Sequence, residues 1–350
     1  MGCIVDTIAY PSNVSHANYS AMYGQSLVKI QIRRSLSVYG ALLEPDPTRE
    51  YKWVISGFED EMREIRERVG SLAAGTKVLM LYSHGNGETL DCLKEYLLDM
   101  AAALTIPVFA YDYEGYGMSG GSSGEKHARR DVEKVYAYLR RTYPEHRLVL
   151  AGRSIGSVTT AHMLHLLTHK RRYRDDLLKG VVLGAIIQSG LASALNIVCV
   201  PRCNTQCDCL KNFDKFTSCP IPILFLHGLY DSLVPSRNSL LLADYYIKAN
   251  SPRCYKEYHQ FIRRVNFTVV SDGLGVLIRV ERCTLILVGG ADHNNFDALA
   301  PDYVYGSIFD FIVNNGNVQG TGYGRFIQTY NNGAASAIDS DRQALMRAVL

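Results

Sequence analysis

The sequence predicts an α/β fold with a mostly parallel central sheet and helices on both of its faces. Apolar runs of five to seven residues alternate with helical segments of about fifteen residues. Such alternation is typical of parallel strands joined by crossover helices. The chain has 350 residues, of which 47% are hydrophobic, and α/β folds of this size often form a single domain.

The expected elements follow one another along the chain. Residues 26–42 alternate partly in polarity and predict two strands on either side of Arg33 and Arg34. Core strands are expected within six apolar runs, at residues 77–83, 106–112, 148–152, 180–189, 221–228 and 283–290. Helices are expected near residues 89–104, 125–141, 155–170, 238–249 and 302–314.

Three segments fall outside this alternation. Residues 267–280 predict a β-hairpin with a glycine-containing turn, inside an insertion at about 250–282 before the last core strand. Residues 1–24 form a separate N-terminal segment. Residues 316–350 are rich in Gly, Asn and Ala and are expected to be a flexible tail. The predicted domain therefore spans residues 25–315.

Composition and charge exclude several classes of protein. The formal net charge is +3, without a basic stripe interleaved with aromatics, so nucleic acid is not an expected partner. The longest uncharged stretch, residues 180–201, is interrupted by four polar side chains, which favours a buried strand over a membrane span. These are Gln188, Ser189, Ser193 and Asn196. No apolar secretory signal occupies the first thirty residues, so a cytoplasmic location with mostly reduced cysteines is expected.

The first residues, MGCIVDT, are similar to a lipidation signal. After removal of the initial methionine, Gly2 could carry a myristoyl chain and Cys3 a palmitoyl chain. Two adjacent acyl chains are what stable attachment to a membrane surface requires. The preferred Ser or Thr position holds Asp6, so an unmodified terminus is the alternative. Attachment to the cytosolic face of membranes is therefore a further hypothesis.

A candidate nucleophile follows the apolar run at 148–152. Residues 152–156 read Gly-Arg-Ser-Ile-Gly, the G-x-S-x-G pattern that holds a serine in a strained turn between a strand and a helix. The small residues Gly152 and Gly156 let the strand and helix approach closely while the Ser154 hydroxyl stays accessible. The five-residue pattern is weak by itself, and ordinary turn chemistry is the alternative interpretation.

A serine hydroxyl needs a base to take its proton and a carboxylate to orient that base. Asp231 and His293 each follow an apolar run downstream of Ser154, in the chain order serine, acid, histidine. Singly, Asp231 could cap a turn and His293 could be a surface histidine, but the coincidence of three strand-end positions favours a catalytic triad. Asp112 precedes the serine and Asp292 adjoins the histidine, so both are interpreted as loop residues.

Backbone N–H groups are expected to stabilise the negatively charged oxygen of a tetrahedral intermediate. One belongs to Ile155, at the start of the helix behind the nucleophile. The other comes from the His-Gly-Asn-Gly loop after the first core strand and is assigned to Asn86, with Gly87 as the neighbouring alternative. His84 and Gly85 are expected to support this loop, His84 through a hydrogen bond within it.

Five of the nine cysteines cluster between residues 199 and 219. Their spacing is irregular and lacks the separated C-x(2–4)-C pairs of zinc sites, so neither a metal nor a cofactor is expected. Reduced thiols are the favoured interpretation, and intermittent disulfides or acylation sites are alternatives. The cluster consists of Cys199, Cys203, Cys207, Cys209 and Cys219.

Five motifs, spread over about residues 75–315, carry a family resemblance. They are LYSHGNGETL, FAYDYEGYGMSGGSSGEK, LAGRSIGSVTT, FLHGLYDSLVP and GADHNN. Together they resemble the α/β-hydrolase domain-containing protein 17 group. The resemblance implies an α/β-hydrolase fold and a serine hydrolase that removes S-acyl chains from membrane-associated proteins. It assigns the nucleophile to Ser154, the acid to Asp231 and the base to His293.

The chain departs from that group in two places. Arg153 stands where the group usually has glutamine, and Cys3 stands where it has a palmitoylated cysteine cluster. The second departure concerns membrane targeting and hence the protein substrate. About thirty residues separate the runs AIIQS and IPILFL, which predicts a short lid that leaves the nucleophile accessible to a thioester on another protein.

Two other functions stay open on the residues alone. The triad does not distinguish a thioester from an oxoester, so a lipase or esterase that acts on monoacylglycerol or small esters is one alternative. The other, from a different class, is a non-catalytic binding or adaptor protein on the hydrolase scaffold. The occupation of all three catalytic positions argues against it.

Overall fold

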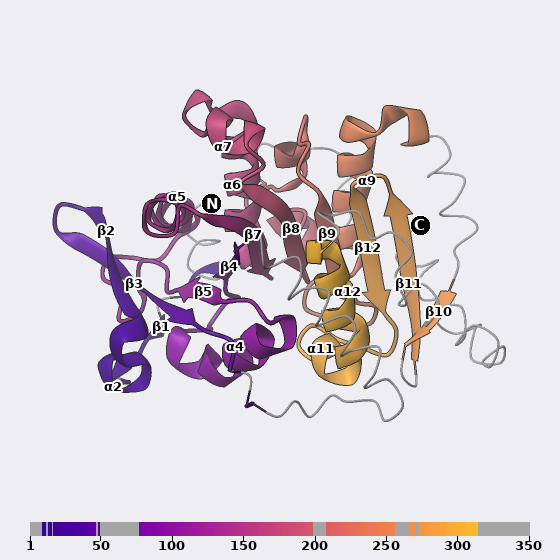
Figure 1. Cartoon of the computed structure of the whole chain (residues 1–350). Coiled ribbons are helices and arrows are strands. Elements are labelled where there is room, and N and C mark those ends of the chain that lie inside the picture. Colours follow the sequence, from indigo (N-terminus) through magenta and orange to yellow (C-terminus); the bar gives the residue numbers. More distant parts are fainter. Residues whose placement is uncertain are drawn as a thin grey trace.

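The computed structural model describes residues 9–11, 13–15, 17–46, 48–49, 77–198, 208–255, 267–270 and 273–313. A ten-stranded sheet forms the centre of this part of the chain (Figure 1). Its core strands are parallel. In spatial order they are β12 (Cys283–Val288), β9 (Ile223–Gly228), β8 (Val182–Gln188), β7 (His146–Arg153), β4 (Lys77–Ser83) and β5 (Val108–Tyr111).

Antiparallel strands extend both edges of this parallel core. Beyond β5 lie β3 (Leu36–Leu43) and β2 (Leu27–Arg33). Beyond β12 lie β11 (Gly273–Val280) and β10 (Phe267–Val270). The sheet is therefore mostly parallel, as predicted, and the predicted hairpin pairs with the last core strand and widens the sheet.

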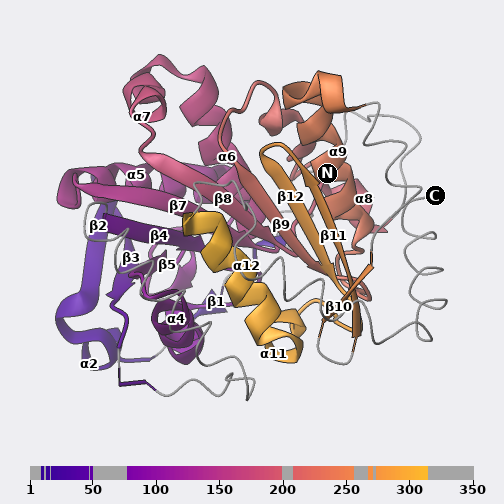
Figure 2. The same cartoon turned by 45° about the vertical axis from the view of Figure 1, so that its right-hand side comes forward.

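Long helices cover both faces of the sheet (Figure 2). One layer consists of α5 (Glu125–Thr142), α6 (Gly156–His169) and α9 (Arg237–Asn250), and the other of α4 (Leu90–Leu104) and α12 (Pro301–Val313). Each helix turns an apolar stripe toward the strands. In α5 the stripe includes Val132, Val135 and Leu139, whose spacing follows the helical period.

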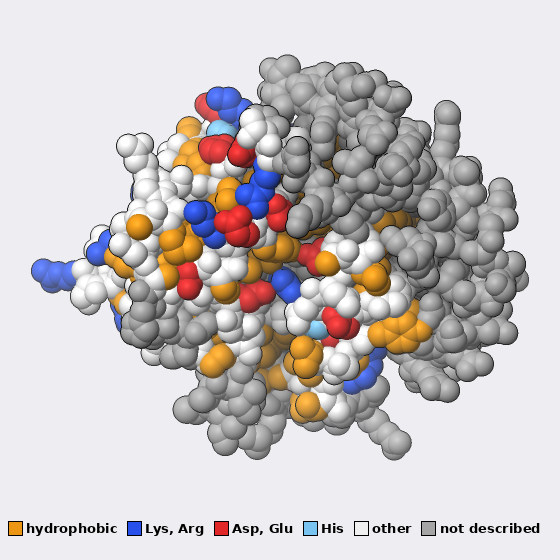
Figure 3. Space-filling view, turned by 90° about the horizontal axis from the view of Figure 1, so that it is seen from below, with side chains coloured by type: hydrophobic (Ala, Val, Ile, Leu, Met, Phe, Trp, Pro, Cys, Tyr) orange, Lys and Arg blue, Asp and Glu red, His pale blue; other side chains and the backbone are white. Residues whose placement is uncertain are grey.

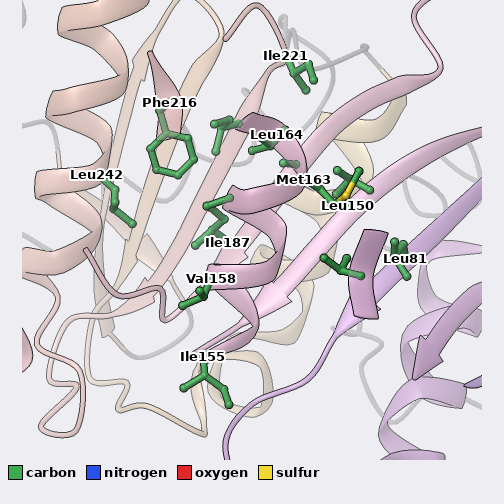
Figure 4. Close-up of a cluster of buried hydrophobic side chains, with 14 of the residues drawn as sticks. Leu81, Leu150, Ile155, Val158, Met163, Leu164, Ile187, Phe216, Ile221 and Leu242 are labelled. Carbon is green, nitrogen blue, oxygen red and sulfur yellow. The ribbon is translucent and has the colours of Figure 1, made fainter. Parts of the chain in front are cut away.

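Buried side chains fill the space between the sheet and the layer of α5, α6 and α9 (Figure 4). Leu150 of β7 and Ile187 of β8 meet Val158 and Leu164 of α6 in this cluster. Every residue of β8 and β9 is buried, as expected for strands covered on both faces. This packing fixes the strand ends from which the candidate site is built.

The direction of winding reverses at β4, because the next strand, β5, lies on one side of it and β7 lies on the other. In open α/β sheets, ligands bind beyond the carboxyl ends of the strands at such a switch point. Figure 3 views the molecule from below Figure 1, the side toward which β12 points. A histidine is visible there among acidic, basic and hydrophobic side chains.

Several short elements lie outside the sequence predictions. The strand β1 (Asn13–Val14) pairs with β6 (Tyr116–Gly117), and α2 (Tyr19–Tyr23) follows β1. The others are α7 (Arg174–Leu178), α8 (Ala194–Val198), α11 (Phe296–Leu299) and the 3₁₀ turns Gly24–Ser26, Arg171–Tyr173 and Phe213–Phe216. Within the described residues, no helix is both long enough and apolar enough to cross a membrane.

Some sequence predictions fall outside the described residues. These include the lipidation candidates Gly2 and Cys3, three members of the cysteine cluster at 199–219 and the tail at 316–350. The expected domain bounds at residues 25 and 315 also stay predictions.

Candidate active site

Ser154 lies in a strained turn between β7 and α6. Its φ angle is +52°, a left-handed conformation that is uncommon for residues other than glycine. A Cβ atom on Gly152 would lie 2.3 Å from the carbonyl oxygen of Gly156, and one on Gly156 would lie 2.1 Å from that of Ser83. The two flanking glycines therefore allow the close approach of β7, α6 and β4 that this turn needs.

Asp231 and His293 meet although 62 residues separate them. Oδ2 of Asp231 lies 2.6 Å from Nδ1 of His293. The pairing follows from the sheet, because Asp231 comes after β9, His293 comes after β12, and these strands are parallel neighbours. The other carboxylate oxygen accepts the backbone N–H groups of Leu233 and Val234, which holds the carboxylate in one orientation.

The environment of Asp231 keeps its carboxylate ionised. Burial acts to raise the pKa of Asp231, but hydrogen bonds from His227 and His293 outweigh it and hold the pKa well below its ordinary value. Because a carboxylate accepts hydrogen bonds, we assign a proton to Nδ1 of His293. Nε2 of that ring is then the nitrogen that can accept a proton.

The loop that carries His293 is joined to the serine turn through its neighbours. Nη2 of Arg153 donates to Oδ1 of Asn294 at 2.8 Å. The Ser189 hydroxyl donates to the carbonyl oxygen of His293 at 3.4 Å. Among the described hydrogen bonds, none joins His293 to the Ser154 hydroxyl. The structure thus places Ser154, Asp231 and His293 at the carboxyl ends of β7, β9 and β12, and among the described hydrogen bonds between these three only Asp231 and His293 are joined directly.

The predicted oxyanion donors lie on the two loops beside Ser154. Asn86 is exposed in the turn after β4. A Cβ atom on its neighbour Gly85 would come within 3.6 Å of Cβ of Ser154, so this loop runs next to the serine. Ile155 precedes the first residue of α6. Among the described backbone hydrogen bonds, none is donated by its N–H.

His84 and Asp112 support the neighbouring backbone. Nδ1 of buried His84 lies 2.8 Å from the carbonyl oxygen of Gly85, so the ring bonds within its own loop. Asp112 accepts the Tyr19 hydroxyl at 2.7 Å and the backbone N–H of Leu90 at 2.9 Å. Burial raises the pKa of Asp112 to about 7. These two hydrogen bonds run to α2 and α4, and Nε2 of His84 lies 3.8 Å from Oδ1 of Asp112.

Asp292 is exposed, and its carboxylate accepts the backbone N–H of Asn294 at 2.8 Å. It therefore closes the turn that carries the histidine.

Two residues in the site were given no role by sequence reasoning. His227 is fully buried, and its Nε2 lies 3.0 Å from Oδ2 of Asp231. Arg153 bonds to both loops beside the serine turn. The histidine stands four residues before the acid and could have been noticed from that spacing. The contacts of Arg153 span distant segments and leave no such local signal.

The cysteine cluster is only partly described. Cys209 is half-buried and Cys219 is buried, and burial raises the pKa of Cys219 to about 12. The remaining members, Cys199, Cys203 and Cys207, lie outside the described residues. Among the residues that the structure covers, no group of three or more His, Cys, Asp or Glu side chains could hold a metal ion.

The mostly parallel sheet with helices on both faces and the serine turn after β7 are features of the α/β-hydrolase fold. The family described as Serine aminopeptidase, S33 matches residues 74–201, a range that contains Ser154. The resemblance to the domain-containing protein 17 group is also confirmed. α/β-hydrolase domain-containing protein 17B of Xenopus laevis is 29% identical over 170 residues, covering 47% of this chain and 54% of that protein.

Protein 17C of Homo sapiens is 28% identical over 184 residues, covering 51% of this chain and 52% of that protein. The chain thus spans about half the length of the curated relatives it matches. Among solved structures, the Pyrococcus furiosus esterase Pf2001 is 12% identical with a TM-score of 0.54, covering 87% of this chain and 97% of that chain. This likeness establishes the α/β-hydrolase fold.

Proposed function

We propose that the chain is a serine hydrolase that cleaves acyl thioesters from S-acylated proteins through an acyl-enzyme on Ser154. The observation that carries the hydrolase part is the 2.6 Å contact between Asp231 and His293 beside a serine in a strained G-x-S-x-G turn. The thioester part rests on the resemblance to the domain-containing protein 17 group.

The first half of the reaction forms the acyl-enzyme. Nε2 of His293 takes the proton of the Ser154 hydroxyl as Oγ attacks the thioester carbonyl carbon. The resulting oxyanion is stabilised by the backbone N–H groups of Ile155 and Asn86, and the start of α6 adds the positive end of its helix dipole. The imidazolium then gives its proton to the sulfur as the carbon–sulfur bond breaks, which releases the deacylated thiol.

The second half regenerates the enzyme. Nε2 of His293 takes a proton from a water molecule, whose oxygen attacks the acyl carbon bound to Ser154. The oxyanion collapses, the carbon–Oγ bond breaks, and Oγ receives the proton back from the imidazolium. Throughout, the ionised carboxylate of Asp231 orients the ring and stabilises its protonated form. The same sequence of steps cleaves an oxoester, so the substrate class needs its own test.

A fluorophosphonate probe tests the nucleophile, because it reacts with activated serines. Wild type is expected to label, while Ser154→Ala and His293→Ala lose labelling and keep their thermal unfolding transition. His169→Ala is the matched control, since its side chain is exposed at the opposite end of α6, and it should label like wild type. A folded wild type that resists the probe would instead favour the non-catalytic binding protein.

Substrate preference is tested with two acyl donors of equal chain length. A palmitoyl-peptide thioester is expected to give a higher kcat/KM than monopalmitoylglycerol. The reverse order would overturn the thioester proposal and favour a lipase or esterase, while the hydrolase assignment would stand.

Membrane attachment through Gly2 and Cys3 belongs to the same proposal, because S-acylated substrates reside at membrane surfaces. Gly2→Ala is expected to move the protein from the membrane fraction to the supernatant. Two acyl chains hold a protein far more stably than one, so Cys3→Ala alone should weaken attachment. A Gly2→Ala variant that stays membrane-bound would contradict this part.

A further inference from the structure

Arg153 connects the two loops on either side of the candidate nucleophile. Its Nη1 lies 3.1 Å from Oε1 of Glu88, in the loop after β4. Its Nη2 donates to Oδ1 of Asn294 at 2.8 Å, in the loop after β12. The two partners are 206 positions apart in the chain, and Asn294 directly follows the proposed base His293. One guanidinium thus touches loops from separate parts of the sheet.

The contact to Glu88 continues to the backbone beside the serine. Oε2 of Glu88 accepts the N–H of Gly85 at 2.5 Å, and Gly85 adjoins the proposed oxyanion donor Asn86. The carboxylate therefore uses one oxygen for Arg153 and the other for this loop. A displacement of Glu88 would move the loop that presents the Asn86 N–H to the substrate.

The site is built to hold a guanidinium. The Arg153 side chain is only 11% exposed, and its Cζ lies 5.8 Å from the centre of the Tyr96 ring on α4. A planar, permanently charged group can stack on a ring and still donate from two nitrogens in fixed directions. A glutamine has one amide group and a shorter reach, so it cannot hold both loops at once.

We propose that Arg153 is a positioning residue that sets the oxyanion loop and the histidine loop at a fixed distance from Ser154. This inference rests on the proposed hydrolase function. Arg153 acts through Glu88 on one side and through Asn294 on the other. Its removal should lower kcat with little change in KM, because misplaced groups weaken stabilisation of the transition state more than substrate binding.

The test uses purified full-length protein and the soluble substrate p-nitrophenyl butyrate. Arg153→Gln is expected to lower kcat by about 10- to 100-fold, the scale expected when reacting groups shift by about an ångström, with KM changed less than about twofold. Arg153→Lys keeps the charge but is a single-point donor, and should recover only part of kcat. Arg172→Gln is the control, because Arg172 forms an exposed ion pair with Glu133 and its loss should leave kcat unchanged.

A double-mutant cycle separates positioning from a local structural effect. Glu88→Gln keeps an acceptor for the Gly85 N–H but loses the charge that pairs with Arg153. If Arg153 acts through Glu88, Arg153→Gln combined with Glu88→Gln should be about as slow as Arg153→Gln alone. Multiplicative losses in kcat would overturn the inference, as would an Arg153→Gln variant with wild-type kcat.

Two further measurements distinguish a failure of this inference from unfolding of a variant and from a failure of the proposed hydrolase function. Thermal unfolding of each variant shows whether it remains folded at the assay temperature, and a lower melting temperature with unchanged kcat counts against the inference. A wild type that hydrolyses no ester and resists the fluorophosphonate probe overturns the proposed function and this inference with it. An active wild type with an unaffected Arg153→Gln variant overturns only the inference.

Discussion

At the scale of single residues, one carboxylate oxygen of Asp231 accepts hydrogen bonds from two imidazole rings. Oδ2 of Asp231 lies 2.6 Å from His293 and 3.0 Å from His227. Nε2 of His227 also lies 2.7 Å from the carbonyl oxygen of Val234, which can only accept, so we assign the His227 proton to Nε2. Nδ1 then accepts the Ser239 hydroxyl at 2.6 Å. This Nε2 proton partly offsets the negative charge of the Asp231 carboxylate. His227 therefore limits how strongly Asp231 stabilises a protonated His293.

Replacing His227 with Asn is expected to move the acidic limb of the kcat/KM profile to higher pH. Asparagine retains a group near the position of Nδ1 but loses the donor to Asp231, so more of the carboxylate charge acts on His293. The measurement is the pH dependence of ester hydrolysis between about pH 5 and 9.

His227→Gln supplies the control, because its amide nitrogen can occupy the position of Nε2 and still donate to Asp231. Its profile should stay close to that of wild type. Within the described residues, His227 on β9 and His293 after β12 are the titratable groups that bond to Asp231. Equal profiles for the Asn and Gln variants would show that the hydrogen bond from His227 does not tune the base.

At the scale of elements, the contact between α6 and β4 sets the geometry of the serine turn. Gly156 is the first residue of α6. A Cβ atom there would lie 2.1 Å from the carbonyl oxygen of Ser83 and 2.8 Å from that of His84. Both neighbours are backbone atoms of the strand end and its loop, so neither can rotate away as a side chain could. Any larger residue must push the helix and strand apart.

Gly156→Ala is expected to destabilise the protein, although alanine is the better helix former. The gain in helix propensity is at most about 1 kcal/mol, whereas overpacking costs about 1–3 kcal/mol. Because the cost of overpacking exceeds the gain in helix propensity, the free energy of unfolding measured in urea should fall. Thr168→Ala, near the other end of the same helix, is the control and should change stability by less than about 1 kcal/mol. A stabilised Gly156→Ala variant would mean that helix and strand separate at little cost.

At the scale of the whole molecule, the N-terminal segment folds back onto the sheet. The Tyr19 hydroxyl of α2 donates to Asp112, which also accepts the N–H of Leu90 at the start of α4. The Tyr23 hydroxyl donates to the carbonyl oxygen of Leu90 at 2.5 Å. Asp112, whose carboxyl group is fully buried, thus joins α2 to α4, and the two residues it binds, Tyr19 and Leu90, are 71 positions apart.

Asp112 is expected to make global stability depend on pH. Burial raises its pKa from an ordinary 3.8 to about 7 in the folded protein. Between these values the unfolded chain releases a proton that the folded chain retains, so the contribution of Asp112 to the unfolding free energy falls as pH rises. The slope approaches about 1.4 kcal/mol per pH unit, and the loss is complete above pH 7.

Asp112→Asn should remove this contribution. Urea unfolding at pH 5 and pH 8 is expected to give a smaller difference in unfolding free energy for the variant than for wild type. Asp175→Asn, which alters an exposed carboxylate in α7, should leave the wild-type difference unchanged. If Asp112→Asn retains that difference, the carboxyl group is ionised in the fold at neutral pH and the burial argument fails.

The sequence alone predicted the parallel core, the hairpin before the last core strand and the order of helices, because each depends on a local pattern of apolar residues. The run at 180–189 becomes the buried strand β8, and the stretch at 125–141 becomes the amphipathic helix α5. It also selected Ser154, Asp231 and His293, since residues that follow parallel strands gather at one edge of a sheet. The pairing of β1 with β6 was not predicted, because strands of two residues are too short to show an alternating pattern.

Only the tertiary structure decided which loops touch. Arg153 and Asn294 are 141 positions apart, and nothing in either neighbourhood of the sequence specifies their contact. Their distance depends on how strand spacing, helix packing and turn geometry add up across β7, β8, β9 and β12. The contact between Asp231 and His293 depends in the same way on the pairing of β9 with β12. Sequence thus determines the elements and the chemical groups they carry, whereas packing determines the hydrogen bonds between them.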